Sequence, residues 1–164
     1  TWFSPDEEQS LVTRAQLKAR IMGALGGRAA EDVVFGHQEV TTGAGGDIQQ
    51  VASMARQMVT RFGMSDLGPV SLEGGNQEVF LGRDLMTRSD VSDSIARQID
   101  EQVRAMVKHC YEETVSIVSA HRQAMDSLVE ILIEKETMDG DEFRAMVGEF
   151  ATIPDKDRST PILN

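Results

Sequence analysis

One carboxylate is a candidate for chemistry because a glycine-rich loop leads directly to it. Residues 40–46 are Val-Thr-Thr-Gly-Ala-Gly-Gly, and Asp47 follows where a helix is expected to start. Aspartate is among the commonest N-cap residues, and Gln50 stands three positions later, so the residues alone favour a cap. The alternative is a metal ligand, because a carboxylate held at a helix start can bind a cation such as zinc. Periodicity does not separate these two interpretations.

The three histidines do not form a metal site among themselves. His109 and His121 are too far apart along one helical pattern to share an ion, and His37 follows Gly36 in an expected loop. Cys110 is next to His109, but neighbouring helical residues point about 100° apart, which disfavours a Cys–His dyad. Cys110 falls on an apolar helical stripe and is expected to be a buried, unreactive thiol.

The glycine-rich loop does not match a phosphate-binding motif. It lacks the Gly-Lys-Ser/Thr ending of a P-loop, and its Gly-x-Gly-Gly differs from the dinucleotide fingerprint. Asp47 would also repel phosphate from the helix N-terminus. The acidic pairs Glu7-Glu8 and Glu112-Glu113 are expected in a loop or on a solvated helix face. The residues alone therefore show no complete catalytic site.

Composition limits the possible partners. The 164 residues suffice for one domain with its own core. The formal net charge of -11 argues against nucleic acid, because that binding relies on Lys and Arg neutralising phosphates. The single Cys110 excludes an internal disulfide and a cysteine-based zinc site. No apolar run approaches the ~20 residues of a membrane-spanning helix, and no signal peptide is recognisable.

Apolar periodicity predicts a mostly α fold. Thr13 and Gln16 form a capping box that opens a helix ending near Phe35, with Gly36 as a left-handed cap. The expected apolar face of this helix is Leu17, Ile21, Ala24, Leu25 and Ala29. Its three internal glycines, which are expected where another backbone approaches closely, are Gly23, Gly26 and Gly27.

Two further helices follow by the same periodicity. One starts at Asp47 and stops at Gly63, and the longest helix is predicted over residues 89–119. The apolar face of the first is expected to be Ile48, Val51, Ala52, Ala55, Met58, Val59 and Phe62. The buried stripe of the second is expected to be Val91, Ile95, Ile99, Val103, Met106, Cys110 and Ile117.

The C-terminal part contains two shorter helical patterns. The first ends near Glu136, and its apolar face is Met125, Leu128, Val129 and Leu132. A capping box of Asp139 and Glu142 opens the second, with Phe143, Met146, Val147 and Phe150 on its apolar face.

The remaining segments carry little helical signal. Residues 64–88 form a glycine-containing connector that is long for a compact domain. At most a few short strands are expected, at residues 1–3 and within 66–83. Residues 154–164 are predicted to be a disordered tail, so the domain is expected to span residues 1–153.

Three segments of the sequence are distinctive when taken together. Residues 23–31 are Gly-Ala-Leu-Gly-Gly-Arg-Ala-Ala-Glu, and residues 40–51 are Val-Thr-Thr-Gly-Ala-Gly-Gly-Asp-Ile-Gln-Gln-Val. Residues 55–65 are Ala-Arg-Gln-Met-Val-Thr-Arg-Phe-Gly-Met-Ser. In this order and spacing they resemble the FtsH family of membrane-anchored, ATP-dependent AAA+ zinc metalloproteases. The resemblance covers residues 1–153 and is strongest to the cyanobacterial and chloroplast thylakoid branch.

The resemblance implies that Asp47 is the third protein ligand of a catalytic zinc ion. The other two ligands in the family are the histidines of an H-E-x-x-H helix, a motif that this sequence does not contain. Bound zinc lowers the pKa of a water molecule toward ~7, and the glutamate of that motif takes its proton. The chain is therefore expected to be the C-terminal part of a metallopeptidase domain, truncated on its N-terminal side and inactive alone.

The resemblance also implies properties of the parent protein. ATP and Mg2+ are expected in an ATPase module that is absent here, and a membrane anchor is expected upstream. The parent is expected in a thylakoid or cell membrane, as a homo- or hetero-hexamer with this domain on the cytosolic or stromal side. Unfolded or damaged membrane and soluble proteins are the expected substrates. Two alternatives stay open: a non-catalytic family paralogue, and a helical oligomerisation or interaction module.

Overall fold

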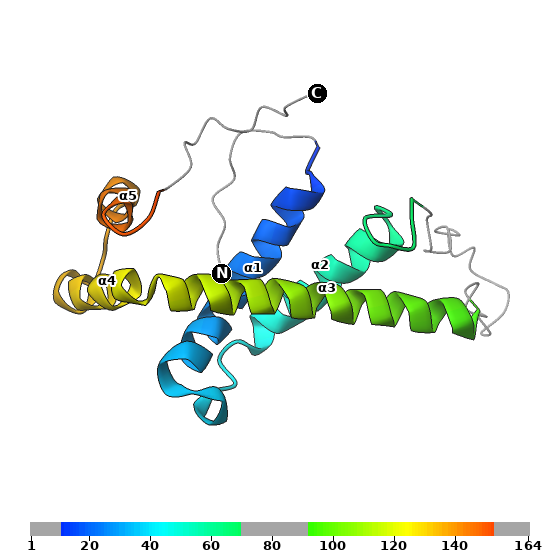
Figure 1. Cartoon of the computed structure of the whole chain (residues 1–164), viewed down its shortest axis with the longest axis horizontal. Coiled ribbons are helices and arrows are strands. Elements are labelled where there is room, and N and C mark those ends of the chain that lie inside the picture. The colour runs from blue at the N-terminus through cyan, green and yellow to red at the C-terminus, as the bar shows by residue number, and fades with distance from the viewer. Residues whose placement is uncertain (1–10, 70–91, 153–164) are drawn as a thin grey trace, which may run out of the picture. The chain divides into compact units, whose positions relative to one another are not determined.

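The computed structural model describes residues 11–69 and 92–152, and helices form the regular structure in both ranges. In chain order the elements are α1 (Arg14–Phe35), η1 (His37–Glu39), α2 (Gly45–Thr60), α3 (Asp93–Ala120), α4 (Arg122–Lys135) and α5 (Gly140–Gly148) (Figure 1). No strand occurs in these two ranges, so the mostly α prediction is confirmed. The strand predicted at residues 1–3, most of the 66–83 segment and the predicted 154–164 tail lie outside the described residues.

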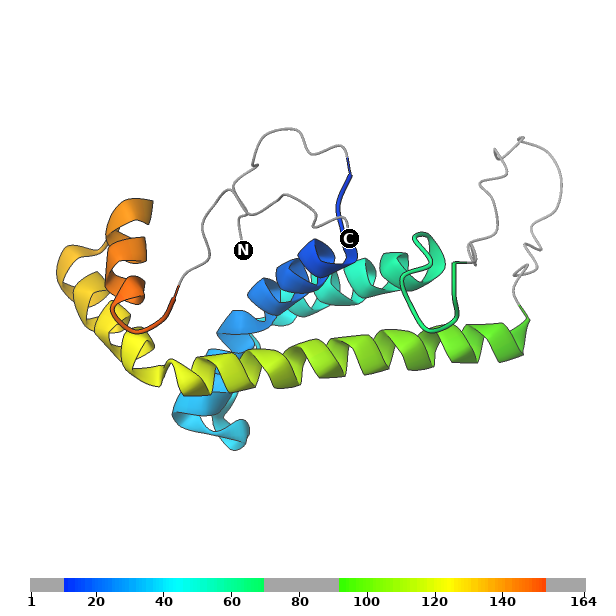
Figure 2. The ribbon, with the colours of Figure 1, turned by 45° about the horizontal axis from the view of Figure 1, so that its top comes forward.

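The chain divides into two compact units, Thr1–Val115 and Ser116–Asn164. The first unit holds α1, η1, α2 and most of α3, and the second holds the end of α3 with α4 and α5. In the first unit α1 and α2 pack against each other, and α3 lies alongside them (Figure 2). The predicted end of the domain at residue 153 stays a prediction.

α1 begins at the predicted capping box. The Oγ1 atom of Thr13 accepts a hydrogen bond from Gln16 N at 3.2 Å, and Gln16 Oε1 accepts one from Thr13 N at 2.8 Å. The helix ends at Phe35, and Gly36 follows with φ 87° and ψ 158°. The positive φ favours glycine as predicted, although ψ is extended and the cap is not left-handed helical. The buried face of α1 is the predicted one: Leu17, Ile21, Ala24, Leu25 and Ala29.

The expectation that glycines of α1 admit a neighbouring backbone is wrong for Gly26 and Gly27. A Cβ atom built at either residue meets nothing within 4 Å. Gly26 is half-buried, whereas Gly23 and Gly27 are exposed. No close neighbour therefore explains the glycines at positions 26 and 27 within the described residues.

α2 is buried mainly toward its C-terminal end. Its buried residues are Val51, Ala55, Met58, Val59 and Thr60. Three members of the predicted face, Ile48, Ala52 and Phe62, are instead exposed. Ile48 and Ala52 lie one turn apart on a side of α2 that is exposed although Val51 between them is buried, and Phe62 lies beyond the end of the helix at Thr60.

Gly63 redirects the chain after α2. Its φ is 59°, and Met64 N donates to Met58 O at 2.7 Å. A Cβ atom at residue 63 would lie only 2.7 Å from Pro69 Cα. Gly63 is therefore required both by its positive φ and by the close approach of the Gly68–Pro69 backbone.

α3 is the longest described helix, as predicted, and its middle part joins the core of the first unit. Ile99, Met106 and Cys110 are buried, Val103 is half-buried, and Ile95 and Ile117 are exposed. Val91 lies outside the described residues. The predicted stripe is thus covered only over its central turns.

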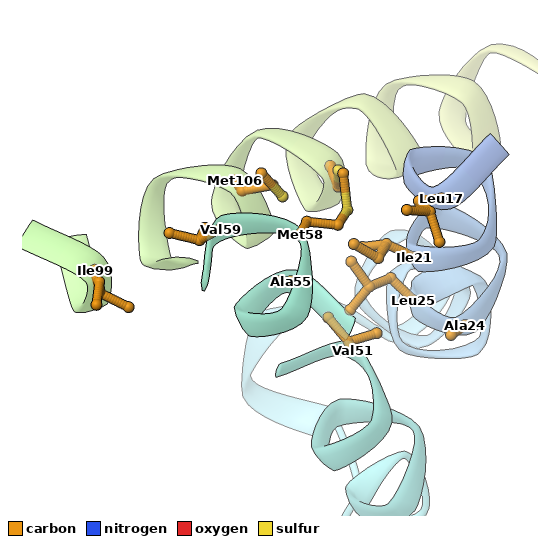
Figure 3. Packing of buried hydrophobic residues seen from close by; sticks show 11 residues of the cluster. Leu17, Ile21, Ala24, Leu25, Val51, Ala55, Met58, Val59, Ile99 and Met106 are labelled. Atoms are coloured by element: carbon orange, nitrogen blue, oxygen red, sulfur yellow. The ribbon is translucent and has the colours of Figure 1, made fainter. Parts of the chain in front are cut away.

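The core of the first unit combines side chains from α1, α2 and α3. Figure 3 shows Met106 of α3 beside Met58 and Val59 of α2, with Ile21 and Leu25 of α1 next to them. The buried cluster is Leu17, Ile21, Ala24, Leu25, Val51, Ala55, Met58, Val59, Ile99, Met106 and Cys110. Burial of such side chains, at roughly 1.5–3 kcal/mol each, is the main force that holds α2 in place.

In the second unit, several polar contacts gather at the end of α4 and the start of α5. α4 stops at Lys135, where Glu136 has φ 63°, and Asp139 caps α5 by accepting from Asp141 N at 3.0 Å and Glu142 N at 2.8 Å. The N-cap prediction for Asp139 is confirmed, but the Glu142 side chain does not complete the predicted capping box. The side chain of Glu142 accepts a hydrogen bond from Lys135 Nζ and so links α5 to α4.

None of the described helices combines sufficient length with sufficient apolar character to cross a membrane.

Candidate metal-ligand site

Asp47 lies at the third residue of α2 and is not its N-cap. The helix begins at Gly45, and the cap residue is Ala44, which makes no capping side-chain hydrogen bond. The cap interpretation is therefore wrong, because Gly45 and Gly46 already belong to the helix. Asp47 is half-buried in the first turn, where a carboxylate is favoured by the positive end of the helix dipole.

The turn that leads to α2 is bonded to α1. Thr41 N donates to Glu31 Oε2 at 2.9 Å, and Thr41 Oγ1 donates to Glu31 Oε1 at 2.8 Å. Arg28 Nη1 donates to Thr41 O at 3.0 Å. Two of the segments that carry the family resemblance, residues 23–31 and 40–51, are thus joined by hydrogen bonds.

These bonds change the acidity of Glu31. The hydrogen bond from the Thr41 backbone N–H, followed by the one from the Thr41 hydroxyl, holds the pKa of the Glu31 carboxyl below its ordinary value of 4.5. Both bonds favour the ionised form, because a carboxylate accepts hydrogen bonds at both oxygens. Glu31 therefore stays charged and able to accept both bonds across the neutral pH range.

A second polar group joins α1 to α3 near this turn. Tyr111 Oη donates to Asp32 Oδ2 at 2.7 Å, and His37 Nδ1 lies 3.4 Å from Asp32 Oδ1. Burial, and then the bond to Asp32, raises the pKa of the Tyr111 hydroxyl, which stays protonated as the donor. Asp32 therefore links α1, η1 and α3 in one place.

The other residues considered for chemistry are not brought to Asp47. His109 Nε2 lies 3.6 Å from Glu113 Oε2 on α3, and His121 Nδ1 donates to Ile117 O at 2.9 Å. Cys110 is fully buried, and burial raises the pKa of its thiol, so it is the unreactive core residue that the periodicity predicted.

The residues present fit one position of a zinc site. The carboxylate of Asp47 is a ligand type that zinc accepts, and its place in a helix first turn limits its movement. In residues 11–69 and 92–152, no three His, Cys, Asp or Glu side chains are grouped to hold a metal ion. Asp47 can thus provide one ligand, and other ligands would have to come from residues outside this set.

The comparisons with known proteins identify the family of this chain. Residues 1–146 match a class of peptidases, described as Peptidase family M41. Because the match covers most of the sequence, this chain belongs to peptidase family M41. The resemblance to zinc-dependent peptidases of the FtsH type is therefore confirmed.

Several relatives carry the FtsH name. The chain is 52% identical over 157 residues to "ATP-dependent zinc metalloprotease FtsH" of Trieres chinensis, covering 95% of this chain and 24% of that protein. It is 49% identical over 158 residues to "ATP-dependent zinc metalloprotease FTSH 2, chloroplastic" of Arabidopsis thaliana, covering 96% and 23%. The FtsH protein of Cyanidium caldarium is 48% identical over 149 residues, covering 91% and 24%. The chain spans about a quarter of the length of these curated relatives.

Sequence reasoning missed the residues that hold the turn. Arg28, Glu31 and Thr41 stand in the segments that carry the resemblance, but nothing in their spacing shows that they bond to one another. A usable signal was the charge of Arg28 and Glu31 in an otherwise small and apolar helical segment. Tyr111, the only tyrosine of the chain, gave no comparable signal.

Proposed function

We propose that this chain is the C-terminal part of the peptidase domain of a membrane-anchored, ATP-dependent zinc metalloendopeptidase. In this proposal the domain spans residues 1–153, and Asp47 is the third protein ligand of the catalytic zinc. The observation that carries the assignment is the place of Asp47. It is half-buried in the first turn of α2, directly after a turn that is bonded to α1. Membership of peptidase family M41 and the names of the relatives support it.

The chemistry of such a site follows from the ligand set. Zinc bound by two histidines and one carboxylate supplies an activated water that attacks a peptide carbonyl. The two histidines and the general base are proposed to come from the H-E-x-x-H helix that the FtsH resemblance implies. The contribution of this chain is to present the Asp47 carboxylate in a fixed orientation. The packing of α2 and the bonded turn before it both serve that purpose.

The wider function is proposed from the relatives. Chloroplastic relatives favour a parent protein in the thylakoid membrane, with this domain on the stromal side. The proposal includes a hexameric ring of family subunits, ATP and Mg2+ in an ATPase module, and unfolded or damaged proteins as substrates. By itself this chain is expected neither to cleave casein nor to retain one zinc per chain, because one carboxylate is too few ligands.

The test uses the full-length parent enzyme with Asp47→Asn. Because Asp47 is not the cap and Asn has nearly the same shape, this change weakens the interaction with the helix dipole without leaving a cavity, and the free energy of unfolding should fall by less than about 1 kcal/mol. The amide is a poor zinc ligand, so zinc content and casein cleavage should be lost together while ATP hydrolysis persists. Wild-type zinc content and cleavage in Asp47→Asn would overturn the assignment.

Asp141→Asn is a matched control. Asp141 also lies in the first turn of a helix, α5, so the substitution removes the same charge from the same kind of position. Its zinc content and casein cleavage should equal those of the wild type. A similar loss in both variants would show that the effect comes from a general change of helix stability.

A further inference from the structure

Thr41 uses all of its polar atoms in hydrogen bonds near the start of α2. Its backbone N and its Oγ1 donate to the two carboxylate oxygens of Glu31, at 2.9 and 2.8 Å. Its carbonyl accepts from Arg28 at 3.0 Å, and its Oγ1 accepts from Gly43 N at 3.2 Å. A residue held by four bonds in different directions is fixed both in position and in orientation.

Backbone hydrogen bonds connect Thr41 and its turn to the helical turn that contains Asp47. Gly45 N donates to Thr42 O at 3.0 Å, and Ile48 N donates to Ala44 O at 2.9 Å, so the turn passes directly into the first turn of α2. A Cβ atom at Gly43 would lie 3.3 Å from Thr41 Oγ1, closer than an ordinary contact. The hydroxyl of Thr41 therefore packs tightly against the turn as well as bonding to it.

The core covers α2 from Val51 onward, whereas most residues of its first turn are exposed. Val51, Ala55 and Met58 are almost fully buried, whereas Gly45, Gly46 and Ile48 are exposed. Core packing thus sets the axis of the helix from Val51 onward. On the other side of Asp47, the bonds of Thr41 hold the chain. Fixing the chain on both sides of Asp47 determines where its carboxylate points.

Thr42, the adjacent residue of the same type, behaves differently. Its carbonyl accepts the bond from Gly45, but this bond depends on the backbone alone. The side chain of Thr41 bonds both to α1 and to the turn, so the two threonines of this motif have different roles. The difference supplies an internal control for any effect of losing a threonine hydroxyl.

We infer that Thr41, held by Glu31 and Arg28, is a positioning residue that orients the Asp47 carboxylate toward its metal ion. This inference rests on the proposed function. Thr41 touches neither metal nor substrate in this role. It acts through the backbone between residues 41 and 47, as partners behind a metal ligand commonly do.

The test compares Thr41→Val, Thr41→Ser and Thr42→Val in the full-length parent enzyme. Valine has the shape of threonine but no hydroxyl, so Thr41→Val removes the bonds to Glu31 Oε1 and from Gly43 N. The dissociation constant for zinc, measured by competition with a chromophoric chelator, should rise about tenfold, the lower end of the range for such partners. Thr41→Ser keeps the hydroxyl and should bind zinc within about twofold of wild type, as should Thr42→Val, a difference below the smallest effect expected of such a partner.

Hydrogen exchange provides a readout that does not depend on activity or on metal. In the zinc-free enzyme, the amide hydrogens of Gly43 and Gly45 should exchange faster in Thr41→Val than in the wild type. In Thr42→Val their exchange rates should equal those of the wild type. Glu31→Gln gives a second route to the same loss, because its amide group cannot accept at both oxygen positions. If both substitutions act through one bond, the double variant Thr41→Val/Glu31→Gln should weaken zinc binding less than the product of the two single effects.

The outcomes separate this inference from the proposed function. If Asp47→Asn weakens zinc binding but Thr41→Val leaves it within twofold of wild type, the positioning role is wrong and the ligand assignment stands. If Thr42→Val weakens binding as much as Thr41→Val, the specific role of Thr41 is also wrong. If Asp47→Asn binds zinc normally, the proposed site fails, whatever the Thr41 variants do.

Discussion

The two units of the chain use helices of similar amphipathic character in different ways. In the first unit eleven buried residues from α1, α2 and α3 form one cluster. Among the described residues of the second unit, by contrast, only Ala124 is buried. Several large apolar side chains of α4 and α5 are exposed there, including Val129, Leu132, Ile133 and Phe143. Amphipathic periodicity thus predicts that a helix forms, but it does not predict that the chain itself covers the apolar face.

The two units also differ in the kind of contact that holds their helices together. The first unit positions its candidate ligand by packing along α2 and by the Thr41 bonds. The second unit is held by the Asp139 cap and by the Lys135–Glu142 ion pair, both close to the chain reversal between α4 and α5. Stability should therefore be dominated by burial in one unit and by local polar contacts in the other.

The largest expected effect is on core packing. Ile21 is fully buried and Ile133 is 78% exposed. Ile21→Ala should lower the free energy of unfolding of the first unit by about 2–5 kcal/mol, because it removes buried methyl groups and leaves a cavity. Ile133→Ala should change that of the second unit by less than about 0.5 kcal/mol. Urea unfolding followed by circular dichroism measures both, and equal effects would contradict the comparison.

The next effect concerns residues with positive φ. The first unit has a glycine at such a position, whereas the second unit has a glutamate. Gly63→Ala should destabilise the first unit by roughly 1–3 kcal/mol, because alanine is strained at φ 59° and its Cβ would meet Pro69. Glu136, at φ 63° in the second unit, is not glycine, so Glu136→Gly should stabilise that unit by up to about 1 kcal/mol. Thermal unfolding of both variants measures the two shifts, which must have opposite signs.

Gly26→Ala is the control for Gly63→Ala. Gly26 lies inside α1, and a Cβ atom there meets nothing within 4 Å. The substitution should stabilise the helix by about 0.5–1 kcal/mol, because alanine loses less conformational freedom on folding. Destabilisation by Gly26→Ala would show that another part of the protein approaches this face.

Removing one helix cap from each unit gives a smaller effect. Thr13→Ala and Asp139→Ala should each cost about 1 kcal/mol. α1 has 22 residues and a buried face, so only its first turn should fray. α5 has nine residues, none of them buried, and helices below ~12–15 residues are marginal without packing. Hydrogen exchange should therefore show loss of protection throughout α5 but only at the start of α1.

The smallest effects are on pH dependence, and they have opposite directions in the two units. The pKa of Glu31 is lowered, so the Thr41 bonds stabilise the fold above the unfolded pKa and are lost as pH falls through the folded value. The hydrogen bond to Glu142 raises the pKa of Lys135, so this pair stabilises below the unfolded pKa and is lost as pH rises through the folded value. NMR titration of the Thr41 amide and the Lys135 side chain measures the two transitions. Glu31→Gln should abolish the first transition, and Glu142→Gln should lower the pKa of Lys135 toward its ordinary value.

Much of the fold could be predicted from the sequence. The capping box at Thr13, the end of α1 at Phe35 and the five buried residues of α1 all follow from local patterns. The exposure of Ile48 and Ile117 could not be predicted, because it depends on which part of each apolar face the rest of the fold covers. That information is tertiary, and the periodicity of one helix does not contain it.

The site was predictable in identity but not in geometry. The resemblance singled out Asp47, and its role as a ligand stays a prediction. The predicted N-cap was wrong by three residues, because the cap is Ala44 and both Gly45 and Gly46, which were expected in a loop, belong to the helix. The bond between Glu31 and Thr41 joins residues ten positions apart across a chain reversal. Such a bond depends on tertiary structure, so no local rule for helices or turns predicts it.

The thiol of Cys110 can be used to measure how often α3 leaves the core. It is the only thiol of the chain, and it is fully buried on the face of α3 that joins the core. A labelling reagent can reach it only when α3 separates from α1 and α2 or when the unit unfolds. The rate of thiol labelling in native buffer therefore measures how often this helix undocks. Comparison with the global unfolding rate would reveal whether the long helix leaves the core before the α1–α2 pair opens.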